Sequence, residues 1–258
     1  MNIFEDFAAN MATRVAEHDA RMADDPEYAR RERERENMET AQRAADATRA
    51  AAKERHAAKR WLMQMGVPVK DVEVLSTAGA LRDTAALNIA RGWWAGDSTC
   101  LVLSGTRGCG KTTAAAWCVA QPPREDPYRA RDAWLRGAIS PRAYRSPLFL
   151  DVSKLQRASR YDEERMLDVE MAATLAIDDL GMEYADAKGS FAALFDALFN
   201  VRYADQLKTV ITTNLTAVDF KARYGERVAD RIRECGVYIE LDEQSLRGRV
   251  ETRQKDAE

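Results

Sequence analysis

The sequence Gly105-Thr-Arg-Gly-Cys-Gly-Lys-Thr112 lies between a short apolar run and an alanine-rich stretch. The run before it, residues 99–104, has the composition of a buried parallel strand. Residues 113–120 contain neither Gly nor Pro, which favours a helix. In a strand–loop–helix setting, the spacing G-x-x-x-x-G-K-[ST] is typical of loops that bind nucleotide phosphates. These flanks make a chance glycine-rich turn the weaker interpretation, and we expect a nucleoside triphosphate site here.

The residue types of this loop fit the chemistry of phosphate and magnesium. Glycines let the backbone bend around phosphate oxygens without a Cβ in the way. The Lys111 ammonium is expected to meet the β- and γ-phosphates, and the Thr112 hydroxyl to face Mg²⁺. The expected nucleotide-binding residues are therefore Gly105, Thr106, Arg107, Gly108, Cys109, Gly110, Lys111, Thr112 and Thr113.

Two neighbouring acids, Asp178 and Asp179, follow the apolar run 174–177. In open α/β sheets, ligands bind at the carboxyl ends of the strands. Asp178 is expected to hold Mg²⁺ opposite Thr112, and Asp179 to orient or deprotonate the attacking water. Asp-Asp-Leu-Gly is also turn-like, so a turn is the alternative interpretation. A phosphate loop in the same chain favours the catalytic one.

Polar residues also end the apolar run that starts at residue 208, and the last of them is Asn214. Its amide is expected to position water against the γ-phosphate, although it could instead cap the helix that follows. Arg227 and Arg231 are four residues apart and therefore share one helical face. They are expected to reach the γ-phosphate of a neighbouring subunit, unless Glu226 and Asp230 pair with them on an exposed helix.

The first 65 residues differ from the rest of the chain. Residues 1–28 are acidic, with apolar residues at helical spacing, which indicates either a docking helix or a frayed terminus. From Pro26 to about residue 65 a long helix is expected, and Gly66 and Pro68 mark its end. Residues 43–60 are basic and precede Trp61. This combination could contact single-stranded nucleic acid, or it could be an exposed helix of mixed charge.

Further strands are expected at 148–152 and 237–241, and further helices at 80–92, 154–161 and 189–203. Another charged helix is expected to end near residue 171. Residues 121–147 contain five prolines and are expected to form a surface excursion with one short helix near 128–137. The pair Trp93-Trp94 is expected to pack beneath the sheet.

Composition sets outer bounds on the function. The chain has 258 residues, 46% of them hydrophobic and 31% charged, which suits one substantial domain and an accessory segment. It contains no apolar run of about eighteen residues, and its start does not look like a signal peptide. Four cysteines without a C-x-x-C pair and two histidines make a zinc site an unfavoured interpretation. A cytoplasmic protein with no membrane contact is expected.

The order of these parts resembles one protein family. From residue 95 to 250, the phosphate loop, the acidic strand end, Thr-Thr-Asn and Gly-Glu-Arg-Val-x-Asp-Arg follow one another. This order, with the ending Leu-Arg-Gly-Arg-Val, is similar to the DnaC/IstB-type branch of AAA+ ATPases. The resemblance implies an α/β fold, a three-layer module with a central parallel sheet and a helical segment before it. It also implies a partner-docking segment at 1–65 and an ATPase domain at 66–258 with a reduced C-terminal lid.

The resemblance also gives roles to single residues. Lys111 and Thr112 resemble the Walker A pair, Asp178 and Asp179 the Walker B pair, and Asn214 sensor 1. Arg231 resembles the arginine finger, with Arg227 beside it, and Arg247 matches the sensor 2 position. Asp179 stands where many AAA+ proteins have Glu, which makes Glu183 a candidate to assist it.

The function implied by the resemblance is that of a helicase loader. Such a protein is an oligomeric ATPase that uses ATP and Mg²⁺ to place a replicative DNA helicase on single-stranded DNA. Residues 1–65 would dock on the helicase. One alternative is a transposition helper that binds duplex DNA and a transposase. Another is a scaffold that binds ATP and hydrolyses little of it.

Overall fold

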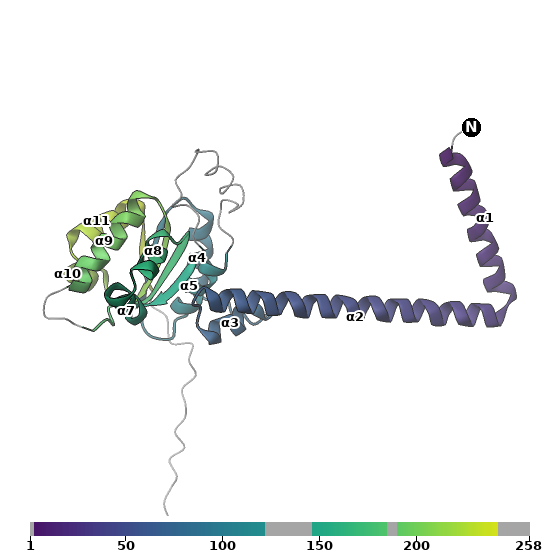
Figure 1. Cartoon of the computed structure of the whole chain (residues 1–258), viewed down its shortest axis with the longest axis horizontal. Coiled ribbons are helices and arrows are strands. Elements are labelled where there is room, and N and C mark those ends of the chain that lie inside the picture. Colours follow the sequence, from purple (N-terminus) through teal and green to yellow (C-terminus); the bar gives the residue numbers. More distant parts are fainter. Residues whose placement is uncertain (1–2, 122–145, 185–189, 242–258) are drawn as a thin grey trace, which may run out of the picture. The chain divides into compact units, whose positions relative to one another are not determined.

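The computed structural model describes residues 3–121, 146–184 and 190–241 (Figure 1). The predicted short helix near 128–137, the C-terminal lid and Arg247 lie outside the described residues. The chain divides into two compact units, Met1–Ala57 and Ala58–Glu258. Each is described by itself below.

Five strands form one parallel sheet in the second unit. They are β1 (Cys100–Gly105), β2 (Leu148–Asp151), β3 (Thr174–Leu180), β4 (Lys208–Thr213) and β5 (Gly236–Leu241). Their order is β2-β3-β4-β1-β5, and every pair is parallel. β1 and β3 are nearly continuous apolar runs because helices cover both of their faces.

Alternate residues of the strands point into two separate cores. Cys100, Val102 and Ile177 contribute to one core, whereas Leu101, Leu103 and Ala176 contribute to the other. The first core contains residues of α7 (Val152–Tyr161), α8 (Glu163–Met171), α9 (Ser190–Ala204), α10 (Ala217–Tyr224) and α11 (Glu226–Cys235). The second contains residues of α3 (Val69–Ser76), α4 (Ala85–Ala95) and α5 (Lys111–Ala120), and Trp93 is among them. The predicted three-layer α/β architecture is confirmed (Figure 1).

Short polar side chains start several of these helices. Thr84, Asp151, Asp162 and Thr216 each accept a hydrogen bond from a backbone N–H in the first turn of the helix that follows. Between α10 and α11 the chain turns at Gly225, whose φ of 92° lies in the left-handed region. The arginine-rich stretch therefore begins a new helix.

The first unit is helical, as predicted. Helix α1 (Ile3–Asp24) is followed by α2 (Pro26–Gln64), which continues into the second unit. Asp25 begins α2 by accepting hydrogen bonds from the N–H groups of Glu27 and Tyr28, at 2.9 and 3.0 Å. The side chains of residues 41–57 are all exposed. Across the described ranges, each helix is too short or too polar to traverse a lipid bilayer.

Candidate nucleotide site

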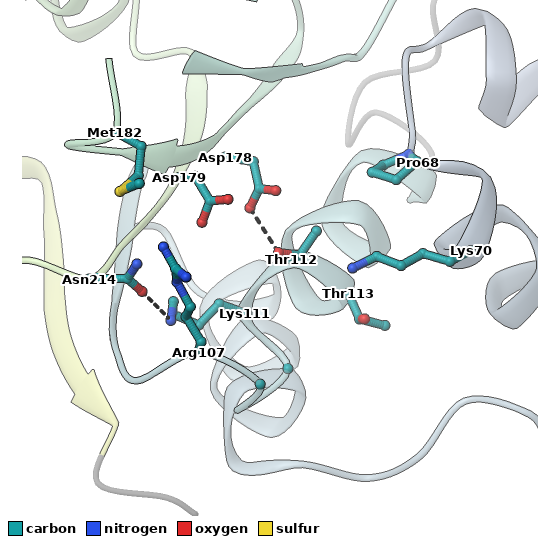
Figure 2. Close-up of a pocket in the computed structure, with 12 residues that line it drawn as sticks. Pro68, Lys70, Arg107, Lys111, Thr112, Thr113, Asp178, Asp179, Met182 and Asn214 are labelled. Atoms are coloured by element: carbon teal, nitrogen blue, oxygen red, sulfur yellow. Dashed lines mark hydrogen bonds between the residues drawn. The ribbon is translucent and has the colours of Figure 1, made fainter. Parts of the chain in front are cut away.

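A cavity of about 530 Å³ opens where β1, β3 and β4 end (Figure 2). Parallel strands present their carboxyl ends at one edge of a sheet, so residues far apart in the sequence meet there. The cavity is lined by Pro68, Lys70, Arg107, Gly108, Gly110, Lys111, Thr112, Thr113, Asp178, Asp179, Met182 and Asn214. Most residues that the sequence singled out are therefore brought together.

The phosphate loop depends on glycine at two close contacts. At Gly105, φ is 143°, and a Cβ would lie 2.6 Å from the Leu241 carbonyl oxygen. At Gly110, φ is 89°, and a Cβ would lie 3.1 Å from the Thr84 hydroxyl oxygen. Helix α5 starts directly after Gly110, so the N–H groups of its first turn face the loop without partners inside the helix. Such a helix start favours an anion.

Lys111 joins the loop to the end of β4. Its buried ammonium donates hydrogen bonds to the Gly105 and Thr106 carbonyls at 2.7 and 2.9 Å. It also donates to the Asn214 Oδ1 at 3.1 Å (Figure 2). Three oxygen acceptors and the Cys109 sulfur, at 3.7 Å, therefore hold a positive charge between two strand ends, beside the start of α5. This is the position in which an ammonium can meet the terminal phosphates of a nucleotide.

Asp178 receives two hydroxyl hydrogen bonds. Thr112 Oγ1 donates to its Oδ1 at 3.0 Å, and Thr212 Oγ1 donates to the same atom at 2.6 Å. Burial raises the pKa of the Asp178 carboxyl, the Thr212 hydrogen bond lowers it and the charge of Asp179 raises it again. A buried carboxylate beside a hydroxyl is a pair of hard oxygen ligands, so Thr112 and Asp178 fit Mg²⁺.

Asp179 has an unusual backbone. Its φ is 56°, and its N–H donates to Thr212 Oγ1 at 2.9 Å, where the pairing of β3 with β4 shifts between Ile177 and Leu180. Aspartate is one of the few residues that tolerate this conformation. The shift leaves the Asp179 side chain exposed and lining the cavity, next to buried Asp178.

The alternative role of Asn214 as a helix cap does not match the structure. Thr216 caps α10, because its hydroxyl accepts a hydrogen bond from the Asp219 N–H at 3.1 Å. The Asn214 side chain instead accepts from Lys111 and lines the cavity.

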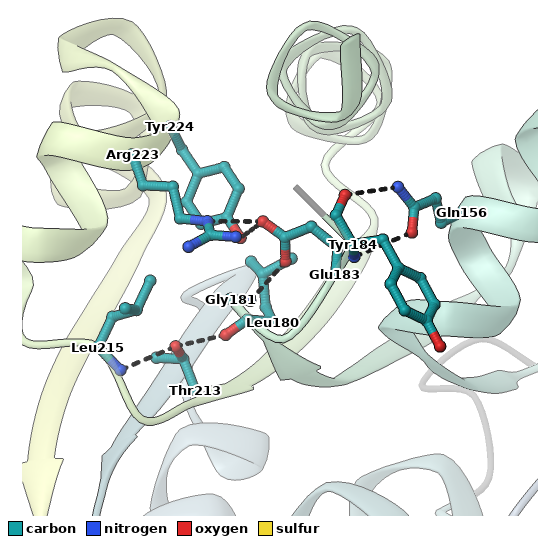
Figure 3. A network of polar contacts seen from close by, with 9 residues as sticks. All are labelled: Gln156, Leu180, Gly181, Glu183, Tyr184, Thr213, Leu215, Arg223 and Tyr224. Atoms are coloured by element: carbon teal, nitrogen blue, oxygen red, sulfur yellow. Dashed lines mark hydrogen bonds and ion pairs between the residues drawn. The ribbon is translucent and has the colours of Figure 1, made fainter. Parts of the chain in front are cut away.

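Several predicted residues lie elsewhere. The structure does not bring Glu183 to the cavity, because its carboxylate accepts hydrogen bonds from Gly181, Arg223 and Tyr224 (Figure 3). In this structure Glu183 therefore does not lie where it could assist Asp179, contrary to our expectation. Cys109 points into the second core and donates to the Thr106 carbonyl, so this side chain does not line the cavity.

Arg227 and Arg231 do not line the cavity of their own chain. Both contact Asp196 of α9, at 2.9 and 3.3 Å, and the Arg231 guanidinium also lies 5.5 Å from the ring centre of Tyr203. Glu226 and Asp230 pair with Arg233 instead. The side chain of Arg227 is 63% exposed, so it remains available to another molecule.

The sequence did not indicate one wall of the cavity. Pro68 and Lys70 line it, and buried Asp71 accepts a hydrogen bond from Thr113 Oγ1 at 2.6 Å. No motif connects residues 68–71 to the phosphate loop, so only folding reveals their proximity. The part played by Thr212 was also missed, although its place at the polar end of a strand was a usable signal.

Comparisons with known proteins give the following picture. No protein-family model matches the chain, and no curated protein matches it. The crystal structure of the DnaC helicase loader is 20% identical over 62% of this chain and 93% of that chain, with a TM-score of 0.44. DnaI is 22% identical over 62% of this chain and 86% of that one, with a TM-score of 0.43.

A putative primosome component from Streptococcus pyogenes serotype M3 is 17% identical over 70% of this chain and 92% of that one, with a TM-score of 0.43. At these identities and TM-scores, the functional assignment rests on the residues of the site.

Proposed function

We propose that this protein is an AAA+ type ATPase. One observation carries the proposal: the Thr112 hydroxyl, at the start of α5, donates to the carboxylate of Asp178, at the end of β3, at 3.0 Å. A hydroxyl from a phosphate loop and a carboxylate from a neighbouring strand end are the pair that nucleotide hydrolases of this loop type use for magnesium. The Lys111–Asn214 contact brings the third strand end to the same place.

Each residue then has a role in the reaction. Lys111 and the first N–H groups of α5 would bind the phosphates and offset their charge. Thr112 and Asp178 would hold Mg²⁺, which would supply positive charge to offset the charge that develops on the phosphates. Asp179 would orient the attacking water or take its proton. Asn214 would hold that water or the γ-phosphate in line, since its amide already lies beside Lys111.

The arginines would act between subunits. Neither Arg227 nor Arg231 lines the cavity of its own chain, whereas an arginine near the γ-phosphate accelerates hydrolysis strongly in nucleotide hydrolases. We assign Arg231, with Arg227 beside it, to the site of a neighbouring copy. Sites shared in this way require an oligomer.

The finer proposal is that of a helicase loader. ATP binding would favour assembly and contact with single-stranded DNA, and hydrolysis would release the partner helicase docked on residues 1–65. The motif order supports this assignment. So do the exposed helical residues 41–57, which include basic side chains that single-stranded DNA can meet.

ATP turnover tests these proposals when it is measured alone, with single-stranded DNA and with duplex DNA. Lys111→Ala, which removes the ammonium, serves as the blank. Stimulation by single strands is the expected result. Stimulation by duplex alone would instead favour the transposition helper. Turnover no faster than that of Lys111→Ala in every condition would contradict the ATPase.

The ATP-bound scaffold is a second candidate because of the acidic pair. Asp179 is one methylene shorter than the Glu common at this position, and Glu183 is committed to other contacts. If hydrolysis is dispensable, Asp179→Asn should leave biological function intact while it removes residual turnover. For the loader, the same substitution should abolish both.

A further inference from the structure

Glu183 is the centre of a buried polar network that the proposed chemistry does not use (Figure 3). Its side chain is 4% exposed. One carboxylate oxygen, Oε1, accepts from Arg223 Nε at 2.6 Å and from the Tyr224 hydroxyl at 2.8 Å. The other, Oε2, accepts from the Gly181 N–H at 2.8 Å. The network therefore joins the loop after β3 to the end of α10.

The loop end of this network adjoins the acidic pair. Gly181 and Glu183 follow Asp179 by two and four residues, and Met182 between them lines the cavity. The loop is fixed on both sides. A Cβ on Gly181 would lie 3.0 Å from the Leu215 side chain, and the amide of Gln156 makes two hydrogen bonds with the backbone of Tyr184. Asp179 and Glu183 are therefore linked through a short loop that has its own packing and hydrogen bonds.

The helix end of the network adjoins the arginines. Tyr224 is the last residue of α10 and packs in the first core against the rings of Phe195 and Phe220, with centroids 5.0 and 4.9 Å away. Gly225 follows, and α11 then carries Arg227 and Arg231. The end of α10 thus adjoins the start of the helix that carries the two arginines.

The chemistry of the network requires a carboxylate. Three donors converge on it, and only two oxygens with negative charge can accept from all of them. Burial and the hydrogen bond to Glu183 raise the pKa of Tyr224 far above its usual value, so its hydroxyl stays a donor. The hydrogen bond to the same carboxylate also raises the pKa of Arg223, against the effect of burial.

We propose that Glu183 is a positioning residue that couples the acidic strand end of the nucleotide cavity to the arginine-bearing helix α11. The coupling rests on the proposed ATPase function. When the γ-phosphate and its water shift Asp179, the loop pulls the end of α10, and Arg227 and Arg231 turn with it. One subunit then presents its arginines according to its own nucleotide state.

The test compares wild type, Glu183→Gln and Tyr224→Phe, with Arg233→Gln as a matched control. Glutamine keeps the volume of Glu183 and cannot accept from all three donors, whereas phenylalanine removes one hydroxyl. Arg233 lies on α11 and pairs only with exposed Glu226 and Asp230 among the contacts described. Three readouts are taken: nucleotide Kd, kcat and KM for ATP, and amide hydrogen exchange of residues 217–235 with and without a non-hydrolysable ATP analogue.

In wild type and Arg233→Gln, the analogue is expected to change exchange in residues 217–235. In Glu183→Gln this change is lost, kcat falls about tenfold or more, and Kd and KM stay within about twofold. Tyr224→Phe is expected to show an exchange change and a kcat between those of wild type and Glu183→Gln. The double substitution should lower kcat no further than Glu183→Gln alone.

The outcomes separate the two proposals. If the wild type binds nucleotide and Glu183→Gln shows the same exchange change and the same kcat, Glu183 only stabilises the fold and the coupling is wrong. If kcat falls only in proportion to the fraction of folded protein, the same conclusion follows. A wild type that does not bind nucleotide would overturn the proposed function, and the coupling with it.

Discussion

Asp178 illustrates a conflict between stability and chemistry within one residue. A carboxylate is costly to bury, and burial raises the pKa of Asp178 above its ordinary value of 3.8. A raised carboxyl pKa means that the folded state holds its proton more tightly than the unfolded state. Stability therefore falls as the pH rises from 3.8 through the raised pKa, and the loss is complete above it. In the proposed site this charge would serve to bind magnesium.

We expect Asp178→Asn to stabilise the nucleotide-free protein at pH 7 while it abolishes Mg²⁺-dependent hydrolysis. An asparagine Oδ1 can still accept from both Thr112 and Thr212, and no buried charge remains. Each kcal/mol gained should raise Tm by about 2–4 °C in a domain of this size. Thermal unfolding at pH 7 and toward pH 4 checks this. The gain should shrink at the acid end, and a lower Tm at pH 7 would contradict the account.

At the scale of elements, the side chain of Arg202, on α9, connects α8 and α9 to the sheet through hydrogen bonds. Arg202, which is 1% exposed, donates to the carbonyls of Val169, Glu170 and Ala172 at 3.1, 3.1 and 2.9 Å. It also donates to the Lys208 carbonyl at 2.7 Å and to the Thr209 hydroxyl at 3.0 Å. Burial lowers its pKa to about 9, which leaves it charged at neutral pH. Arg202 thus supplies a hydrogen-bond donor inside the core for the last carbonyl groups of α8.

Arg202→Met should lower the free energy of unfolding by about 3–5 kcal/mol, because four buried or partly buried carbonyls lose a donor. Urea unfolding measures this loss of stability, and the m-value is expected to stay unchanged. Nucleotide affinity of the folded protein should stay the same, since Arg202 bonds to the start of β4 and the cavity lies at its end. A loss of affinity with normal stability would contradict this assignment.

At the scale of the whole molecule, the assignment of Arg231 predicts complementation. Arg231→Ala should bind ATP normally and lose stimulated hydrolysis, and Lys111→Ala should lose hydrolysis as well. In an equal mixture, a subunit with an intact Lys111 can receive Arg231 from a neighbour at about one site in four. Turnover should therefore return on mixing. Mixtures as inactive as their parts would show that Arg231 does not act in trans.

The two units predict a second whole-molecule result. The chain 58–258 should remain folded and bind nucleotide, because Leu62, Met65 and Val67 of the second core remain in it. It should lose partner docking and any DNA response that the exposed residues 41–57 provide. Circular dichroism and nucleotide titration check the first part, and turnover with single-stranded DNA checks the second. Unchanged DNA stimulation would place the DNA contact on the second unit alone.

Local sequence determined the strands, the phosphate loop and the long helix of this protein. Apolar runs, glycine spacing and helix stops act over a few residues, so Gly105–Thr112 and the end of β3 could be predicted without the fold. Asp178 was predicted to face Thr112 because parallel strands end at one edge of a sheet, and the 3.0 Å contact agrees with that geometry.

Tertiary structure alone decided which polar groups pair over long distances. Thr212 reaches Asp178 because the parallel register that pairs Ile177 with Ile211 places the next residues of β3 and β4 side by side. Glu183 turns away toward Tyr224, and Arg202 of α9 lies in the core. Lys70 and Asp71 approach the phosphate loop only through packing of α3 on α5. Such pairings depend on strand register and helix packing, which local preference does not encode, and a buried donor takes whichever acceptor the fold brings within reach.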